Sequence, residues 1–294
     1  MRFLQAVRKV AFVRRAHVIL DFRKTELIST ELAPLLAAEI ARIKAMRDGN
    51  AVTGYSPNDA EARRRLQALG LFKALGIHEV ASTEEVEKAN EQFEIKTGIA
   101  LDGEVPDELA EEFSIALGLS VDQRRLIEKA FKEALENISE HAYYDKARIA
   151  WPAEQGRWWI CCVTSIERKG AFMLACDLGM TIPATIKETA AKRGPSNVAE
   201  LARYVAANIG RTEDEKLLGA AFQDGVTRRA DGKGGRGLGK MKTLIDEFPD
   251  GRLILWSGGA KALIEPGGKM TIRRLAQPFY GTYVMWHLGQ EPIT

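Results

Sequence analysis

The sequence predicts an α/β protein, with a large mixed sheet in its C-terminal half and a smaller α/β region before it. Two observations support this fold class. In the C-terminal half, apolar runs of strand length alternate with segments whose apolar residues recur every three and four positions. The first half follows the order strand, helix, strand, helix, which is typical of an α/β layer.

The C-terminal half is expected to form one α/β sandwich, with the helices on one face of the mixed sheet. Its strands are expected at 147–151, 157–165, 170–176, 252–257, 269–275 and 281–288. Its helices are expected at 183–192, 196–209 and 238–247.

The first half is expected to hold a smaller domain. Residues 18–22 predict a buried strand, and Ser29 or Thr30 is expected to cap the helix that follows. Residues 54–59 predict a turn, and a second helix is expected to end near Gly76. We therefore expect three parts: a small α/β domain, a helical linker region that includes 83–97 and 107–117, and a large domain, at 1–78, 79–118 and 119–294.

Composition narrows the functional classes. The chain has 294 residues and a net charge of +2, so its overall charge does not predict binding to nucleic acid. No apolar run reaches the length of about eighteen residues that a membrane span needs. Of the three cysteines, Cys161 and Cys162 fall in a predicted strand, which favours reduced thiols in a cytoplasmic protein. The basic N-terminus, residues 1–15, is expected to form a surface helix or strand.

The first motif is an acidic stripe on a predicted helix at 121–144. Glu133, Asn137 and Glu140 recur at three and four positions beside the apolar stripe, and His141 lies where the two stripes meet. An amide oxygen is a suitable magnesium ligand, and a carboxylate one turn away can orient or deprotonate a nucleophile. An ordinary amphipathic helix with a solvated acidic face would show the same pattern.

The second motif follows the predicted strand at 170–176. Asp177 stands at the strand end, where a carboxylate can accept a hydrogen bond from an exocyclic amine such as that of adenine. Gly179 would let the backbone approach a flat base, because it has no side chain. Ile182 and Pro183 begin the next predicted helix. A plain strand, turn and helix start is the alternative interpretation.

The third motif is the glycine-rich loop at 231–239, which leads into a predicted helix. Such a loop presents backbone N–H groups to an anion. Its spacing matches neither the Walker pattern nor the Rossmann fingerprint. The alternative is a flexible basic loop. The loop and its flanks are rich in basic residues, which suits a triphosphate: Arg228, Arg229, Lys233, Arg236, Lys240 and Lys242.

In this order, the three motifs resemble the GHKL superfamily of ATPases, which includes gyrase B subunits, heat-shock chaperones, histidine kinases and MutL proteins. Glu133 and Asn137 match its N-box, and Asp177 and Gly179 match its first glycine box. The likeness covers residues 120–294 and is greatest to the stand-alone kinases of anti-sigma type. The second glycine box is matched by Gly235, Gly237 and Gly239.

The resemblance implies a Bergerat-type α/β sandwich that binds ATP and Mg²⁺. It implies that Asn137 holds the magnesium ion and that Glu133 is the catalytic base or positions the nucleophile. Asp177 would bind the adenine amine, with Thr282 supporting it through water. Residues 194–234 would form a mobile lid.

The resemblance also implies the remaining residues of the nucleotide site. The glycines of the second box would cap the phosphates, with Arg236 and Lys240 as candidates for direct phosphate contacts. One departure is Thr181, which stands where the family usually has a second glycine and would crowd the base or add a hydrogen bond. The further ATP-binding residues are expected to be His141, Ile182 and Leu238.

Three functions remain open on the sequence alone. The first is a serine/threonine protein kinase or phosphotransfer regulator acting on a protein partner. Residues 18–77 resemble a STAS domain, in which Ser29 or Thr30 would occupy the place of the phosphorylated residue, unless they merely cap a helix. The second is an ATP-hydrolysing conformational switch that controls a partner interface. The third is an interaction module that does not use nucleotide, and the retention of Glu133, Asn137, Asp177 and the Gly-x-Gly-x-Gly run argues against it.

Overall fold

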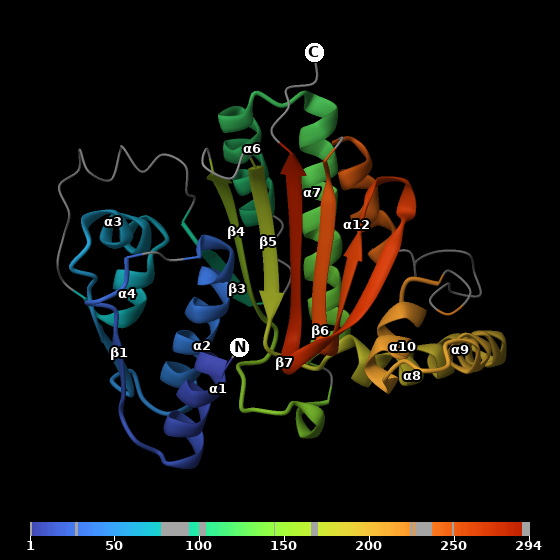
Figure 1. Cartoon of the computed structure of the whole chain (residues 1–294), viewed down its shortest axis with the longest axis horizontal. Helices are drawn as coiled ribbons and strands as arrows, with labels where there is room; N and C mark the ends of the chain where they lie inside the picture. The colour runs from blue at the N-terminus through green and yellow to red at the C-terminus, as the bar shows by residue number, and fades with distance from the viewer. Residues whose placement is uncertain are drawn as a thin grey trace.

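The protein is a mixed α/β structure with two sheets (Figure 1). A five-stranded sheet has the strand order β3-β4-β5-β7-β6, and a separate two-stranded sheet pairs β1 with β2. The α/β class predicted from the sequence is confirmed. The computed structural model describes residues 2–26, 29–77, 94–99, 104–143, 145–165, 170–223, 226, 237–248 and 250–289.

The large sheet is antiparallel at every described pair of neighbours, so the prediction of a mixed sheet was wrong. The physical reason is the connection between strands: β4 to β5 and β6 to β7 follow each other directly along the chain and pair as hairpins. Its strands are β3 (Lys96–Ile99), β4 (Arg157–Ser165), β5 (Gly170–Asp177), β6 (Arg252–Ile264) and β7 (Met270–Gly289).

Strands β6 and β7 are longer than the sequence predicts. The strands expected at 269–275 and 281–288 are one continuous strand, and β6 runs past Gly258 to Ile264. Register shifts on both sides of Gly258 absorb the glycines that interrupt the strand pattern. The strand expected at 147–151 is absent, because Asp145 caps a short 3-10 turn there, Lys146–Arg148.

One face of the sheet is covered by helices α6 (Glu104–Leu117), α7 (Val121–Asn137) and α12 (Gly237–Asp246), shown in Figure 1. Helix α7 begins with a capping box formed by Ser120 and Gln123, and a π-helical turn, Ile138–Ala142, extends its end. The helix predicted at 121–144 is therefore present, and its last turn is π-helical.

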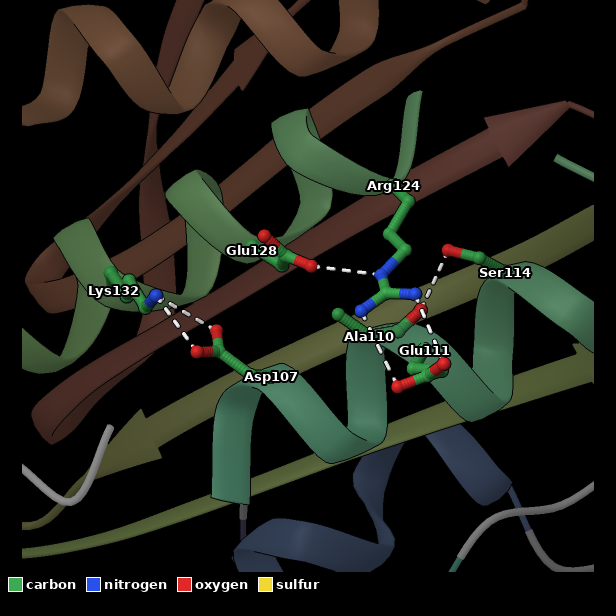
Figure 2. Close-up of polar contacts among 7 residues, drawn as sticks. All are labelled: Asp107, Ala110, Glu111, Ser114, Arg124, Glu128 and Lys132. Atoms are coloured by element: carbon green, nitrogen blue, oxygen red, sulfur yellow. Dashed lines mark hydrogen bonds and ion pairs between the residues drawn. The ribbon is translucent and has the colours of Figure 1, made fainter. Parts of the chain in front are cut away.

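Ion pairs link α7 to α6 (Figure 2). The Lys132 ammonium lies 2.9 Å from the Asp107 carboxylate, and Arg124 bridges Glu111 on α6 and Glu128 on α7. These contacts lie on the side of α7 that faces α6. Because their side chains are partly exposed, these pairs add little to the apolar packing between the two helices.

The other face of the sheet is covered as well, by helices of the N-terminal region. Helix α2 (Ala33–Met46) packs against β4 and β5, and a second buried core lies between them. Helix α1 (Arg2–Arg8) contributes Leu4, Val7 and Arg8 to this core. The N-terminal segment was expected at the surface, but it is partly buried against the sheet.

Arg8, Glu39 and Arg42 form a buried charged cluster in this second core. Both oxygens of the Glu39 carboxylate are used, one by the Arg8 guanidinium and the other by Arg42. The Arg8 and Arg42 guanidiniums also lie over the rings of Tyr280 and Phe12. Burial lowers the pKa of Arg42, and the Glu39 carboxylate opposes that change. Pairing with Glu39 offsets part of the cost of burying the two arginines, although one nitrogen of Arg8 and two of Arg42 are buried without a hydrogen-bond partner.

The small sheet follows the predicted order of strand, helix, strand, helix. Strands β1 (Val18–Asp21) and β2 (Val52–Tyr55) pair in parallel on either side of α2 in the sequence. Part of the turn expected at 54–59 is thus the end of β2. The expected second helix is two helices, α3 (Ala60–Ala68) and α4 (Leu71–Leu75), because Gly70 adopts a left-handed conformation between them.

The expected cap of α2 is not formed. The residue before the helix is Leu32, at the end of a 3-10 turn, Thr30–Leu32, and no side chain caps the helix. The Ser29 hydroxyl instead donates to the Glu31 carboxylate at 2.6 Å.

The region predicted as a helical linker, 79–118, contains elements of the large sheet and its cover. Strand β3 lies at the end of the helix expected at 83–97 and pairs with β4, with Lys96 opposite Ile160. Helix α6 matches the stretch expected at 107–117, and Phe113 is buried in the core beneath it. Residues 78–93 and 100–103 lie outside the described residues.

Three further helices lie beside the lower end of the sheet in Figure 1: α8 (Ile182–Arg193), α9 (Pro195–Ala207) and α10 (Glu213–Ala220). The first two match predicted helices closely. Helix α10 has its own capping box and buried leucines, within the stretch expected to form the lid. No helix in the described part of the chain has both the length and the apolar character needed to cross a membrane.

Candidate nucleotide site

A cavity of about 800 Å³, including its open mouth, lies where the end of α7, helices α8 and α12, and strands β5 and β7 meet. Its walls are largely apolar, with side chains such as Met180, Ile186 and Leu255. Size and lining are those of a small-molecule site, which is usually apolar with a few placed polar groups. The predicted residues that line it are Asn137, His141, Asp177, Ile182, Leu238 and Thr282.

Asp177 lies at the deep end of the cavity and is 1% exposed. Its carboxylate accepts a hydrogen bond from the Gly179 backbone N–H at 2.8 Å, and Thr282 donates through both its backbone N–H and its hydroxyl. Burial raises the pKa of this carboxyl from 3.8 to about 7, and these hydrogen bonds oppose the rise. A hydrogen-bond donor on a ligand would stabilise the charged form further.

Gly179 is required by the protein backbone itself. A Cβ atom at this position would lie 2.2 Å from the carbonyl oxygen of Ala142, which accepts a hydrogen bond from the Met180 N–H at 2.6 Å. The neighbouring Leu178 N–H donates to the Tyr143 hydroxyl at 3.1 Å. Close approach of the π-helical turn after α7 is therefore one reason for a glycine at this position.

Thr181 also has a role within the protein. Its hydroxyl accepts the Ala184 N–H at 3.3 Å and caps helix α8, whose first turn contains Pro183. It is not among the residues that line the cavity. The structure thus shows Thr181 as a helix cap.

A buried serine that was not predicted from the sequence links the elements at the deep end of the cavity. Ser257 on β6 is fully buried, and its hydroxyl accepts the Ile182 N–H at 2.8 Å. The same hydroxyl donates to the Gly281 carbonyl at 2.9 Å and lies 3.3 Å from the Thr282 hydroxyl. It connects the start of α8 to the strand that carries Thr282. Only the pairing of β6 with β7 brings it there, so no local pattern indicates it.

Two predicted site residues, Glu133 on α7 and Lys240 on α12, are not among the residues that line the cavity, although Asn137 and Leu238 on the same helices are. The Glu133 carboxylate forms an ion pair with the Lys240 ammonium, and their side chains are 12% and 55% exposed. The Asn137 amide N–H donates to the Glu133 carbonyl at 2.7 Å, which leaves the amide oxygen as the group for a metal. His141 lies in the π-helical turn, with its Nε2 3.6 Å from the Glu140 carboxylate.

The second glycine box is only partly described. Gly237 begins α12 and Gly239 lies in its first turn, where a Cβ atom at Gly239 would meet open space. The predicted contacts Gly235 and Arg236 lie outside the described residues. In the described part of the chain, no group of three or more histidine, cysteine, aspartate or glutamate side chains is placed to hold a metal ion.

Helix α8 adds a polar stripe that was not predicted. Thr185, Thr189 and Arg193 line the cavity at intervals of four residues. This i, i+4 spacing is visible in the sequence, and it would have indicated a polar face on the predicted helix at 183–192.

Comparison with models of known protein families finds no match, and no curated protein matches the chain.

Proposed function

We propose that this protein is a magnesium-dependent, ATP-binding regulatory protein of GHKL type. The observation that carries the proposal is the Asp177 carboxylate, buried at the deep end of an apolar cavity and fixed by Gly179 and Thr282. A buried acceptor of this kind favours a ligand that donates a hydrogen bond, and the exocyclic amine of adenine is such a donor. The apolar walls suit a flat base.

The other end of the cavity suits the phosphates and the metal. The Asn137 side chain lines the cavity, and its amide oxygen would be a magnesium ligand beside the phosphate oxygens. The first turn of α12 would supply backbone N–H groups to the phosphates. Lys240 lies in the same turn. Glu133 would then orient or deprotonate the nucleophile.

For the reaction, we propose serine/threonine kinase or phosphotransfer activity on a protein partner. Ser29 lies on the other side of the sheet from the cavity, because the Tyr283 hydroxyl donates to the Glu31 carbonyl while Thr282 and Val284 face the cavity. Transfer to Ser29 or Thr30 from the cavity of the same chain is therefore disfavoured. An accepting hydroxyl would belong to another chain, a STAS-like protein or another regulator.

The alternative is an ATP-hydrolysing switch that controls a partner interface. One observation favours it: the N-terminal helices pack on the reverse face of β5 and β7, the strands that carry Asp177 and Thr282. A nucleotide-dependent change in these strands would reach the N-terminal helices directly. Incubation with labelled ATP separates the two reactions, since a kinase transfers label to added protein and a switch releases free phosphate.

Calorimetry with magnesium and ATP tests the proposed binding. Wild type should bind ATP, and Asp177→Asn should lose affinity by about 1–3 kcal/mol, the cost of an imperfectly paired buried polar group. Asp214→Asn is a matched control, because Asp214 also accepts a glycine N–H, from Gly259 at 2.6 Å, but does not line the cavity. Equal ATP affinity in wild type and Asp177→Asn would remove the basis of the proposal.

A further inference from the structure

The ion pair between Glu133 and Lys240 joins two residues with different proposed tasks. Lys240 is the candidate for contact with the phosphates, and Glu133 is the candidate for action on the nucleophile. Glu133 lies on α7, one turn before Asn137, and Lys240 lies in the first turn of α12. The two helices pack against each other, and the Trp286 indole N–H fixes α12 by donating to the Met241 carbonyl at 3.0 Å. The pair therefore forms between firmly placed backbones.

Paired in this way, Glu133 is a blocked base. The Lys240 ammonium engages Oε1 of the carboxylate, so it competes with any hydroxyl or water that would bind there. The Glu133 side chain is only 12% exposed, so solvent has little access to the carboxylate. For Glu133 to act on a nucleophile, Lys240 has to move away.

A triphosphate would compete for the same ammonium. Phosphates at the first turn of α12 would lie next to the Lys240 backbone and carry more negative charge than one carboxylate. The Lys240 side chain is 55% exposed and has a flexible four-carbon stem, so it can change partner without a change of fold.

Resting on the proposed function, we infer that Lys240 regulates Glu133 by exchanging partners. Without nucleotide, Lys240 pairs with Glu133 and keeps the carboxylate from acting on water or other hydroxyls. When ATP binds, the ammonium moves to the phosphates and the carboxylate becomes free to act on the nucleophile. Lys240 is in this sense a positioning residue, and the site becomes competent only when its substrate is present.

Calorimetric ATP affinities of a set of variants test the exchange. Glu133→Gln keeps the shape of the side chain but releases Lys240, so it should raise ATP affinity several-fold. In a Lys240→Met background the same substitution should have no such effect, because no ammonium remains to be released. A Lys240→Arg background, which keeps the charge, should restore the gain. Circular dichroism checks that each variant is folded.

The matched control is the neighbouring ion pair between Lys132 and Asp107 (Figure 2). Asp107→Asn releases a lysine one residue away from Glu133, but on the side of α7 that faces α6, so ATP affinity should not change. An equal gain from Glu133→Gln with and without Lys240 would mean simple repulsion between Glu133 and phosphate, and would overturn the exchange. No gain would overturn it as well. Failure of wild type to bind ATP would instead overturn the proposed function and the exchange together.

Discussion

The two ends of the cavity are built differently. At the deep end, the proposed base end, Asp177 and Ser257 are almost completely buried. Hydrogen bonds from Gly179 and Thr282 fix the Asp177 carboxylate. Beside the other end, the proposed phosphate end, Glu133 and Lys240 form an ion pair in which the lysine is half exposed. The base end is desolvated, whereas the phosphate end carries a charged pair of which the lysine is exposed to solvent and the glutamate is not.

This difference separates the energetic roles of the two ends. A buried hydrogen-bonding group discriminates strongly between ligands, because a ligand that leaves it unpaired incurs the full desolvation penalty of that group. An exposed ion pair contributes little to stability, since solvent and salt screen it, so its partners exchange readily. We therefore expect substitutions at the base end to affect stability and affinity, and substitutions at the phosphate end to affect turnover.

The largest expected effect is on turnover at the phosphate end. Glu133→Gln should retain ATP binding and lose roughly 10²–10⁴-fold in hydrolysis or transfer, the usual contribution of a general base. Single-turnover assays with labelled ATP measure the loss. Glu136→Gln is the control, because Glu136 is an exposed acid on the same helix. If Glu133→Gln reacted at the wild-type rate, Glu133 would be a structural acid only.

The next largest effect is a pH dependence of the unfolding free energy, and it arises from Asp177. Native Asp177 has a pKa of about 7, against 3.8 for an ordinary aspartate, so the folded protein holds this proton more tightly than the unfolded chain. Its contribution to stability is therefore present below pH 4 and is lost as the pH rises through about 7.

At about 1.4 kcal/mol per pKa unit, the unfolding free energy of wild type relative to Asp177→Asn should fall by a few kcal/mol over this range. Denaturant unfolding of both proteins between pH 4 and about pH 8 measures the difference. A difference that does not vary with pH would show that Asp177 is not desolvated.

Smaller effects on stability are expected when one glycine near each end is replaced by alanine. Gly179→Ala places a methyl group against the Ala142 carbonyl, so it should destabilise the fold by about 1–3 kcal/mol. Gly239→Ala meets open space within helix α12, so it should stabilise the protein by roughly 0.5–1 kcal/mol. Chemical denaturation measures both. Similar stability changes in the two variants would contradict the contrast between a packed end and an open end.

The elements that the sequence predicts well have regular spacing and local end signals. Helix α8 was expected at 183–192 and runs Ile182–Arg193, bounded by Pro183 and Gly194. Strands β4 and β5 are apolar enough to be recognised without partners. Asp177 and Asn137 are predictable for the same reason, since each belongs to a short motif on one element.

Features that depend on distant partners were not predictable. Strand β3 is a short edge strand with no apolar run of its own, and only β4 gives it a place in the sheet. Arg8 belongs to a segment that was expected at the surface. Its burial depends on the ion pair with Glu39, which is distant in the sequence. The Glu133–Lys240 pair joins residues 107 positions apart, so no local spacing indicates it.

The central claim is that Asp177 recognises the adenine amine, and the relative affinity for ATP and GTP tests it most directly. Guanine presents a carbonyl oxygen where adenine presents the amine, so it offers the carboxylate a second acceptor instead of a donor. Wild type should bind ATP about 10- to 100-fold more tightly than GTP, which corresponds to about 1–3 kcal/mol, and Asp177→Asn should lose most of this preference. Equal binding of ATP and GTP by wild type, or the same preference in both proteins, would contradict the claim.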